Sequence, residues 1–357
     1  MDFGLSDEQL LLQQSARELH ARECSPAVVR RVFESGAGHA PELWKRSCQL
    51  GLGGLLIPER WGGAGLELLD AALFAEVLGE SAAPGPFLGH SLAGLAISLA
   101  GSDAQCKRWL GPLAAGELIG TVALEEASGG IAPAAARTRI ERGRASGVLC
   151  RVPAGELADV IVVAAKGDRL AVVERGAGAL SAEESADRTR LLANLRLDRS
   201  PCEPLARAKG VAARVRDAAR VLLAADAFGG SQRLVEMSVA YARTREQFGQ
   251  SIAQFQAVKH DLADLALRTE TSRGLFWYAA HAWDAIPHEA ERLAALAKAH
   301  LTDRYLETAR KAVELHGGIG FTWECDVHLW YRRALLNRVL FGTPTGLREN
   351  CAQLAGW

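Results

Sequence analysis

The chain has 357 residues with 41 Lys+Arg and 42 Asp+Glu, so its formal net charge at pH 7 is −1. This balance excludes a strongly basic surface, and neither a nucleic-acid nor a membrane partner is expected. Hydrophobic residues make up 49% of the chain, which is ample for a large core.

The cysteines and the first residues indicate a cytoplasmic protein. The seven cysteines are scattered and form no C-x-x-C pair, which is typical of reduced thiols and predicts neither a disulfide framework nor a metal site. The opening MDFGLSDEQ has no basic segment followed by an apolar run, so no secretory signal is expected. No apolar run approaches the ~20 residues that cross a bilayer.

Residues 1–118 predict an N-terminal helical domain. Ser6 opens a capping box, which predicts a helix to about His20. Further helices are expected at about 41–50, in the second half of 51–79 and within 83–101. Ser102 is the expected N-cap of the last one.

The pattern changes at Thr121, and residues 119–205 predict a middle β domain. The apolar runs there are short, β-branched and separated by Gly, Pro and Asp-rich turns. This pattern favours a small, mostly antiparallel β region.

Residues 206–357 predict a C-terminal four-helix bundle. Long helices are expected over 206–245, 252–285, 288–318 and 326–340, the second continuous for about 50 Å. Short connections between long helices indicate antiparallel packing. The fold class is therefore α+β and mainly α, in the order helical domain, β domain, four-helix bundle.

Two loops in the bundle carry candidate binding residues. RTREQFGQSIAQFQ (243–256) breaks a helix at Gly249, where the fork of Arg245 could hold a phosphate pair or simply complement the helix dipole. VELHGGIGFTWECD (313–326) contains Gly317 and Gly318, which allow close approach of a ligand, although Gly317 could equally end a helix. Two nearby histidines, His316 and His328, are expected as helix-end or packing residues.

These two loops resemble the C-terminal signatures of the acyl-CoA dehydrogenase family. LWKRSCQLGLGGLLIPERWGGAGL (43–66) and GSDAQCKRWLGPLAAGELIG (101–120) resemble its N-terminal domain. The resemblance covers the whole chain. It implies the family's three-domain fold, an FAD cofactor and oxidation of an acyl-CoA thioester, in which a carboxylate removes the α-proton and a β-hydride passes to the flavin.

The resemblance also implies a set of FAD-contact residues. In the family, an Arg, a Phe and a Gln of the first signature contact the FAD of the neighbouring subunit, and these positions are Arg245, Phe248 and Gln256 here. The glycine loop that meets the adenosine portion is Gly317–Gly318. Glu314 stands where the family often has Gln, which weakens that contact.

The family's own-subunit flavin pocket is not kept in this sequence. The family's T-E-P-x-x-G-S segment reads EEASGGI, so Glu125 and Ile131 replace a Thr and a Ser. The strand that stacks a Trp on the flavin reads RVP, with Arg151 and Pro153 at the Trp and Thr positions. Pro153 offers the flavin neither an N–H nor a hydroxyl group.

The catalytic carboxylate is missing from both positions that the family uses. The first is Phe341, just before the GTPTG segment (342–346), which itself could be a surface tether or a loop closing over a site. The second is Ala219, on the first bundle helix. Asp217 points elsewhere on that helix, and Asp226 shares the face of Ala219 but lies ~10 Å along it. No catalytic residue is therefore assigned.

The pattern favours the base-lacking subunit of a heteromeric (α2β2) bacterial acyl-CoA dehydrogenase with one FAD per heterodimer. Its expected partners are a catalytic acyl-CoA dehydrogenase subunit and the acyl-CoA substrate, which the resemblance associates with bulky steroid side chains. An electron-transfer flavoprotein is a candidate electron acceptor. Two alternatives stay open: a non-catalytic homo-oligomeric binding protein, and an active homomeric enzyme with a displaced base such as Asp226.

Overall fold

The computed structural model describes residues 4–126 and 136–357. The chain divides into two compact units, which we call the bundle unit and the mixed unit. The bundle unit combines Met1–Arg31, Ala72–Ala83 and Arg220–Trp357, and the mixed unit combines Val32–Ala71 with Pro84–Ala219.

Three helices have residues in both units. They are α2 (Pro26–Ser35), α4 (Leu68–Glu80) and α7 (Val211–Thr244). Helix α2 was not expected from the sequence.

The mixed unit contains most of the expected N-terminal helices. They are α3 (Pro41–Gln49), α5 (Phe87–Ala100) and α6 (Asp103–Ala114), with short 3-10 turns η1 (Leu52–Gly54) and η2 (Glu59–Trp61). The predicted N-cap of α6 is confirmed, because the Ser102 hydroxyl accepts from the Gln105 N–H and the Gln105 side chain accepts from the Ser102 N–H. Such reciprocal capping fixes the start of a helix.

Two four-stranded sheets form the β region of the mixed unit. The strands are β1 (Gly120–Ala123), β2 (Arg139–Glu141), β3 (Arg144–Pro153), β4 (Val160–Ala165), β5 (Arg169–Glu174), β6 (Ala179–Glu183), β7 (Leu192–Pro201) and β8 (Glu203–Pro204). One sheet has the order β1-β4-β5-β8 and the other β2-β3-β7-β6, and only the β1–β4 pair among them is parallel. Leu149, Val163, Val173 and Leu195 belong to one buried cluster that joins both sheets. The predicted mostly antiparallel β region is therefore confirmed.

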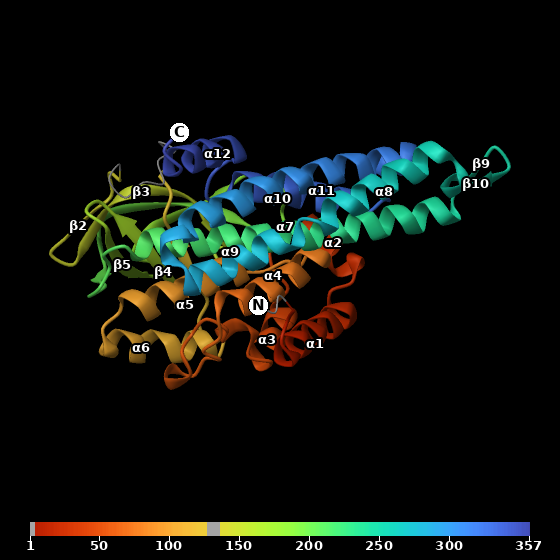
Figure 1. Cartoon of the computed structure of the whole chain (residues 1–357). Helices are drawn as coiled ribbons and strands as arrows, with labels where there is room; N and C mark the ends of the chain where they lie inside the picture. The colour runs from red at the N-terminus through yellow and green to blue at the C-terminus, as the bar shows by residue number, and fades with distance from the viewer. Residues whose placement is uncertain (1–3, 127–135) are drawn as a thin grey trace. The chain divides into compact units, whose positions relative to one another are not determined.

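The bundle unit contains the remaining helices. They are α1 (Asp7–Glu23), α8 (Gln256–Glu270), α9 (Arg273–Ala285), α10 (Pro287–Leu315), α11 (Val327–Val339) and α12 (Pro344–Leu354), with 3-10 turns η4 (Ile252–Gln254) and η5 (Gly317–Phe321). A two-stranded hairpin of β9 (Glu246–Gln247) and β10 (Gln250–Ser251) extends beyond the ends of α7 and α8 (Figure 1). The predicted fold class, with helices, a small β region and a C-terminal helical bundle, is confirmed.

The prediction of one continuous helix over 252–285 was wrong. The helix ends at Glu270 and a new one, α9, begins at Arg273. At the break, the hydroxyl groups of Thr271 and Ser272 donate to the carbonyl oxygens of Leu267 and Arg268, each at 2.8 Å. Side chains that satisfy helix carbonyls in this way compete with the main-chain ladder.

Helices α4 and α7 cross within the bundle unit at two glycines. A Cβ added at Gly79 would lie 2.0 Å from the carbonyl oxygen of Asp226, and one added at Gly229 would lie 1.9 Å from that of Glu76. Because no side chain fits in these gaps, glycine at both positions allows the two backbones to touch.

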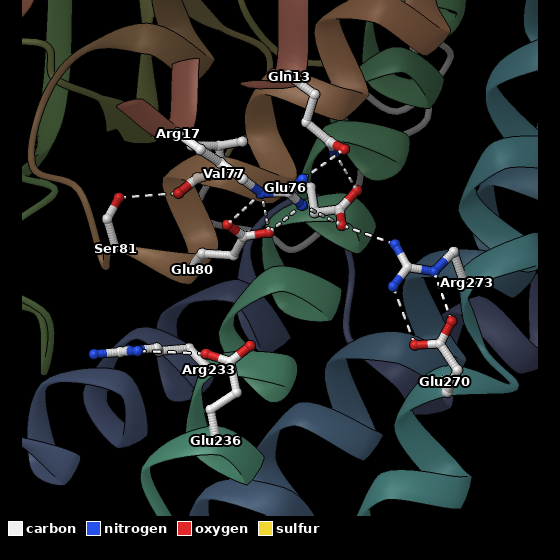
Figure 2. Close-up of polar contacts among 10 residues, drawn as sticks. All are labelled: Gln13, Arg17, Glu76, Val77, Glu80, Ser81, Arg233, Glu236, Glu270 and Arg273. Carbon is white, nitrogen blue, oxygen red and sulfur yellow. Dashed lines mark hydrogen bonds and ion pairs between the residues drawn. The ribbon is translucent and has the colours of Figure 1, made fainter. Parts of the chain in front are cut away.

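A buried carboxylate next to this crossing joins three helices of the bundle unit (Figure 2). Glu76 of α4 is fully buried; it accepts from Gln13 of α1 at 2.9 Å and from Arg273 of α9 at 3.0 Å. Arg17 of α1 contacts Glu76 at 3.4 Å and Glu80 at 2.6 Å. Burial raises the pKa of Glu76 to about 7, although Arg273 and Arg17 act in the opposite direction. Glu76 and its three partners, Gln13, Arg17 and Arg273, thus connect α1, α4 and α9.

Candidate cofactor site and base positions

Arg245 follows the last residue of α7 and begins the hairpin connection to α8. Its main chain is fixed, since its N–H donates to the Tyr241 carbonyl at 2.8 Å and its carbonyl accepts from Ile252 N–H at 2.8 Å. Its side chain is exposed and, among the described residues, the guanidinium has no hydrogen-bond or ion-pair partner. A fixed backbone with an unpaired fork suits an anion supplied from outside the chain.

Phe248 and Gln256, the other two signature positions, are also exposed. Phe248 is 91% exposed at the hairpin tip, where its backbone has a left-handed φ of 54° and its ring meets Phe255 edge-on at 6.1 Å. Gln256 is the first residue of α8. The sequence placed Gly249 at a simple helix break, whereas the structure has a hairpin with Gly249 in its turn. The three side chains thus belong to one projecting connection.

The second signature lies at the C-terminal end of α10. His316 caps that helix, and Gly317 follows with a left-handed φ of 62°, which is the helix-ending role that the sequence left open. Gly318 has no such φ, and a Cβ added there would meet nothing within 4 Å. Its small size is therefore not required by any described neighbour.

A ring stack ties the two signatures together. Tyr241, one turn before Arg245, stacks on His316 with ring centroids 4.4 Å apart. His316 is buried, which lowers its pKa, and its Nδ1 lies 2.7 Å from the Ala312 carbonyl. His316 is thus a packing residue, as expected. Glu314 is exposed and forms an ion pair with Lys311 at 3.0 Å.

His328 also occupies a packing position. Its ring meets that of Trp323 edge-on at 4.7 Å. Burial and the neighbouring Arg30 and Arg332 lower its pKa to about 4.

Phe341 is buried, with 1% of its surface exposed, and has a left-handed φ of 53°. Its carbonyl accepts from the buried Arg220 at 3.2 Å, and the carbonyl of Gly342 accepts from the buried Lys298 at 2.6 Å. The unusual φ accompanies a turn whose carbonyls face two buried cations. The following segment is neither a tether nor a closing loop, because Thr343 caps α12 and Pro344 is its first residue.

Ala219, the second base position, is fully buried on α7. Asp226, the candidate displaced base, is also buried, with 1% exposed. Its carboxylate accepts from Asn337 at 2.5 Å and pairs with Arg333 at 3.4 Å. The guanidinium of Arg333 is itself fully buried, so Asp226 has a structural ion-pair partner.

Two residues that the resemblance places at flavin-facing positions of the mixed unit contact each other. Arg151 and Glu125 form an ion pair, and the Glu125 side chain is 3% exposed. Arg151 lies at a bulge between β3 and β7 with a left-handed φ of 51°. Pro153 is buried, and its carbonyl accepts from the Thr121 hydroxyl. Ile131 lies outside the described residues.

Comparisons with known proteins identify the family. The acyl-CoA dehydrogenase N-terminal domain matches residues 6–117, and the acyl-CoA dehydrogenase C-terminal domain matches residues 210–355. The acyl-CoA dehydrogenase IpdE2 of Mycobacterium tuberculosis is 34% identical over 95% of this chain and 94% of its own. The chain therefore belongs to the acyl-CoA dehydrogenase family, which consists of FAD-dependent oxidoreductases of lipid metabolism.

Two solved structures are similar along nearly the whole chain. The Tcur3481–Tcur3483 steroid ACAD, in its G363A variant, is 28% identical with a TM-score of 0.91 over 98% of both chains. Butyryl-CoA dehydrogenase from Megasphaera elsdenii is 23% identical with a TM-score of 0.89 over 100% of both chains, and this likeness concerns the fold. Across residues 4–126 and 136–357, no helix is both long and apolar enough to cross a membrane.

The residues at the expected FAD-contact positions differ in their chemistry. Arg245, whose side chain has no partner among the described residues, and the open Gly318 suit a pyrophosphate and a nucleoside approaching from outside. By contrast, Glu125 and Arg151 neutralise each other at positions that the resemblance assigns to the flavin pocket. The sequence alone did not predict this ion pair, since the two residues lie 26 positions apart.

Proposed function

We propose that the chain is the non-catalytic subunit of a heteromeric FAD-dependent acyl-CoA dehydrogenase. In an α2β2 assembly with one FAD per heterodimer, it contributes side chains and the Gly317–Gly318 loop to the FAD held by a catalytic partner. The contributing side chains are those of Arg245, Phe248, Gln256 and Glu314. One contrast carries the proposal: Arg245 is exposed and unpaired among the described residues, whereas Phe341 and Ala219 are buried hydrocarbon.

The proposed division of work follows from charge and chemistry. When bound, the flavin accepts the β-hydride of the acyl-CoA thioester, and the partner's carboxylate removes the α-proton. In this chain, Arg245 offsets the charge of the FAD pyrophosphate with a charge-assisted contact. A hydrocarbon side chain cannot accept a proton, so neither Phe341 nor Ala219 can replace that carboxylate.

The relatives support this proposal and suggest a substrate class. One similar structure is named as a pair, Tcur3481–Tcur3483, and as a steroid ACAD. We therefore propose a bulky acyl-CoA, such as a steroid side-chain thioester, as the substrate of the complex, with an electron-transfer flavoprotein as a candidate acceptor. Domain boundaries after residues 118 and 205 and a cytoplasmic location are kept as predictions.

The alternative with a displaced base is less well supported by the contacts of Asp226. A general base needs a carboxylate within reach of the substrate, and this one is buried between Arg333 and Asn337. The homo-oligomeric binding protein shares every contact described above. It differs in predicting a stable, colourless protein that gains no flavin from a partner.

The test is to produce the chain alone and together with a candidate catalytic acyl-CoA dehydrogenase subunit, and to record flavin absorbance and dye reduction by acyl-CoA substrates. The proposal predicts a colourless, poorly soluble chain alone and a yellow, active complex. The Asp226→Asn variant should keep the dye-reduction activity of the complex, provided that it still folds. Flavin and activity in the chain alone, with activity abolished by Asp226→Asn while FAD stays bound, would favour the homomeric enzyme.

A further inference from the structure

Most of the loop from Gly317 to Trp323 is exposed, with Gly317, Gly318, Ile319, Phe321 and Trp323 all on the surface. A Cβ at Gly317 or Gly318 would meet nothing within 4 Å, and Phe321 is 80% exposed. Gly320 is buried, where an added Cβ would lie 2.4 Å from the carbonyl of Val313. Because so little of the loop packs into the bundle unit, its position depends on how its two ends are held.

The N-terminal end of the loop is held by the Tyr241–His316 stack described above. At the other end, Trp323 is 56% exposed, and its ring contacts two polar side chains. The guanidinium of Arg332 lies over its ring at 5.1 Å, and His328 meets it edge-on. These contacts hold the ring, and another group contacts the main-chain carbonyl of Trp323.

That group is Arg30 of α2, about 290 positions earlier in the chain. Its Nη1 donates to the carbonyl of Trp323, and its Nη2 pairs with the carboxylate of Asp326. Asp326 is the N-cap residue of α11, a position where aspartate usually caps the helix, yet its side chain makes no capping bond. Its carboxylate is engaged by Arg30 instead.

We propose that Arg30 is a positioning residue for the cofactor: it clamps the C-terminal end of the glycine loop so that Gly317–Gly318 meets the adenosine portion of the FAD held by the partner. This inference rests on the proposed function. A planar fork can hold a carbonyl and a carboxylate three residues apart at the same time, which a lysine ammonium on a single stem does with less geometric control. The clamp therefore depends on arginine and not on positive charge alone.

The experiment compares four variants of the co-purified complex: Arg30→Ala, Arg30→Lys, Arg31→Ala and Arg245→Ala. Arg31 is the adjacent, exposed arginine of α2 and serves as the matched control. Two quantities are measured, the FAD dissociation rate and the amide hydrogen exchange of residues 317–326.

We expect Arg30→Ala to speed amide exchange in 317–326 and FAD release, the latter by about threefold to tenfold, with Arg30→Lys in between. Arg31→Ala should change neither, and thermal unfolding should show that Arg30→Ala leaves the global fold intact. If Arg245→Ala speeds FAD release but Arg30→Ala does not, the clamp is wrong and the proposed function stands. If neither variant affects FAD release, the proposed function itself has failed. If Arg31→Ala matches Arg30→Ala, the effect belongs to charge and the clamp is again wrong.

Discussion

At the scale of single residues, Arg245 and Phe341 of the candidate site have opposite environments. Arg245 has a fixed backbone and an exposed guanidinium, as expected for a residue that serves a ligand outside its own chain. Phe341 has the opposite character, since its ring is buried and its main chain is held by Arg220. Lys298 donates to the next carbonyl, that of Gly342, so two buried cations hold the main chain of this turn.

Replacing Arg245 by alanine should weaken FAD binding in the complex by about 2–3 kcal/mol, because a charge-assisted bidentate contact is lost. The measurement is the FAD dissociation constant of the complex. Arg243→Ala is the control, since Arg243 is also exposed and lies in the last turn of α7. Equal FAD affinity in the Arg245→Ala complex and the unaltered complex would contradict the assigned role.

Replacing only the arginine of the Glu125–Arg151 ion pair should destabilise the mixed unit more than replacing both residues. Arg151→Ala leaves the Glu125 carboxylate buried without this partner, which should cost about 1–3 kcal/mol in urea unfolding, given that Arg151 is partly exposed. Adding Glu125→Thr to that variant should restore part of the loss, because the buried charge is removed. The single variant Glu125→Thr completes the comparison. If the stability lost in the double variant equals the sum of the stabilities lost in Arg151→Ala and Glu125→Thr, the two residues are not coupled.

At the scale of elements, the sequence predicted helices with clear caps and missed features that depend on distant partners. The Ser6 capping box begins α1 as expected, with the Ser6 hydroxyl accepting from Gln9 at 3.2 Å. The break between α8 and α9 was missed because apolar spacing continues through Thr271–Ser272. Helix α2 is only 10 residues long, and its role in holding Asp326 depends on a residue almost 300 positions away.

The α4–α7 crossing makes a direct prediction for Gly79. Gly79→Ala would place a methyl group 2.0 Å from a main-chain carbonyl, so the two helices must separate. We expect a loss of about 2–4 kcal/mol in the free energy of unfolding. The control is Gly274→Ala in α9, where an added Cβ meets nothing within 4 Å; this change should be neutral or slightly stabilising. Equal stabilities of the two variants would contradict the close crossing.

Glu76 makes the stability of the bundle unit depend on pH. Its pKa of about 7 lies above the ordinary value of 4.5, so the folded chain holds a proton in this range that the unfolded chain has released. This group's contribution therefore favours folding at low pH and is lost as the pH rises through 7. Between about pH 5 and about pH 8, we expect a loss on the order of 2 kcal/mol that is absent in Glu76→Gln. Urea unfolding at the two pH values measures it, and an identical pH slope in Glu76→Gln would contradict the assignment.

At the scale of the whole molecule, the order of helical, β and helical regions could be predicted because it is expressed in local periodicity. Apolar residues at 3–4 spacing give the helices, and short β-branched runs between turns give the strands. The candidate FAD-contact positions lie in two contiguous signatures and stay predictions. The Glu125–Arg151 pair and the Arg30 clamp could not be predicted, because each joins residues that only the fold brings together.

The proposed function also bears on what one chain can do alone. Under this proposal, Arg245 and the Gly317–Gly318 loop supply one half of a cofactor site, and pairing two copies of this chain would add no base at Phe341 or Ala219, which are both buried hydrocarbon. A second, complementary subunit would supply the carboxylate. We therefore expect a fixed ratio between cofactor and polypeptide.

The most direct test is the number of FAD molecules per polypeptide in the purified complex of this chain with its partner, from flavin absorbance and quantitative amino-acid analysis. We expect one FAD for every two chains, which is about half a flavin per polypeptide. All of this FAD should be lost when the partner is removed. One FAD per polypeptide, or a full complement retained by this chain in isolation, would contradict this expectation.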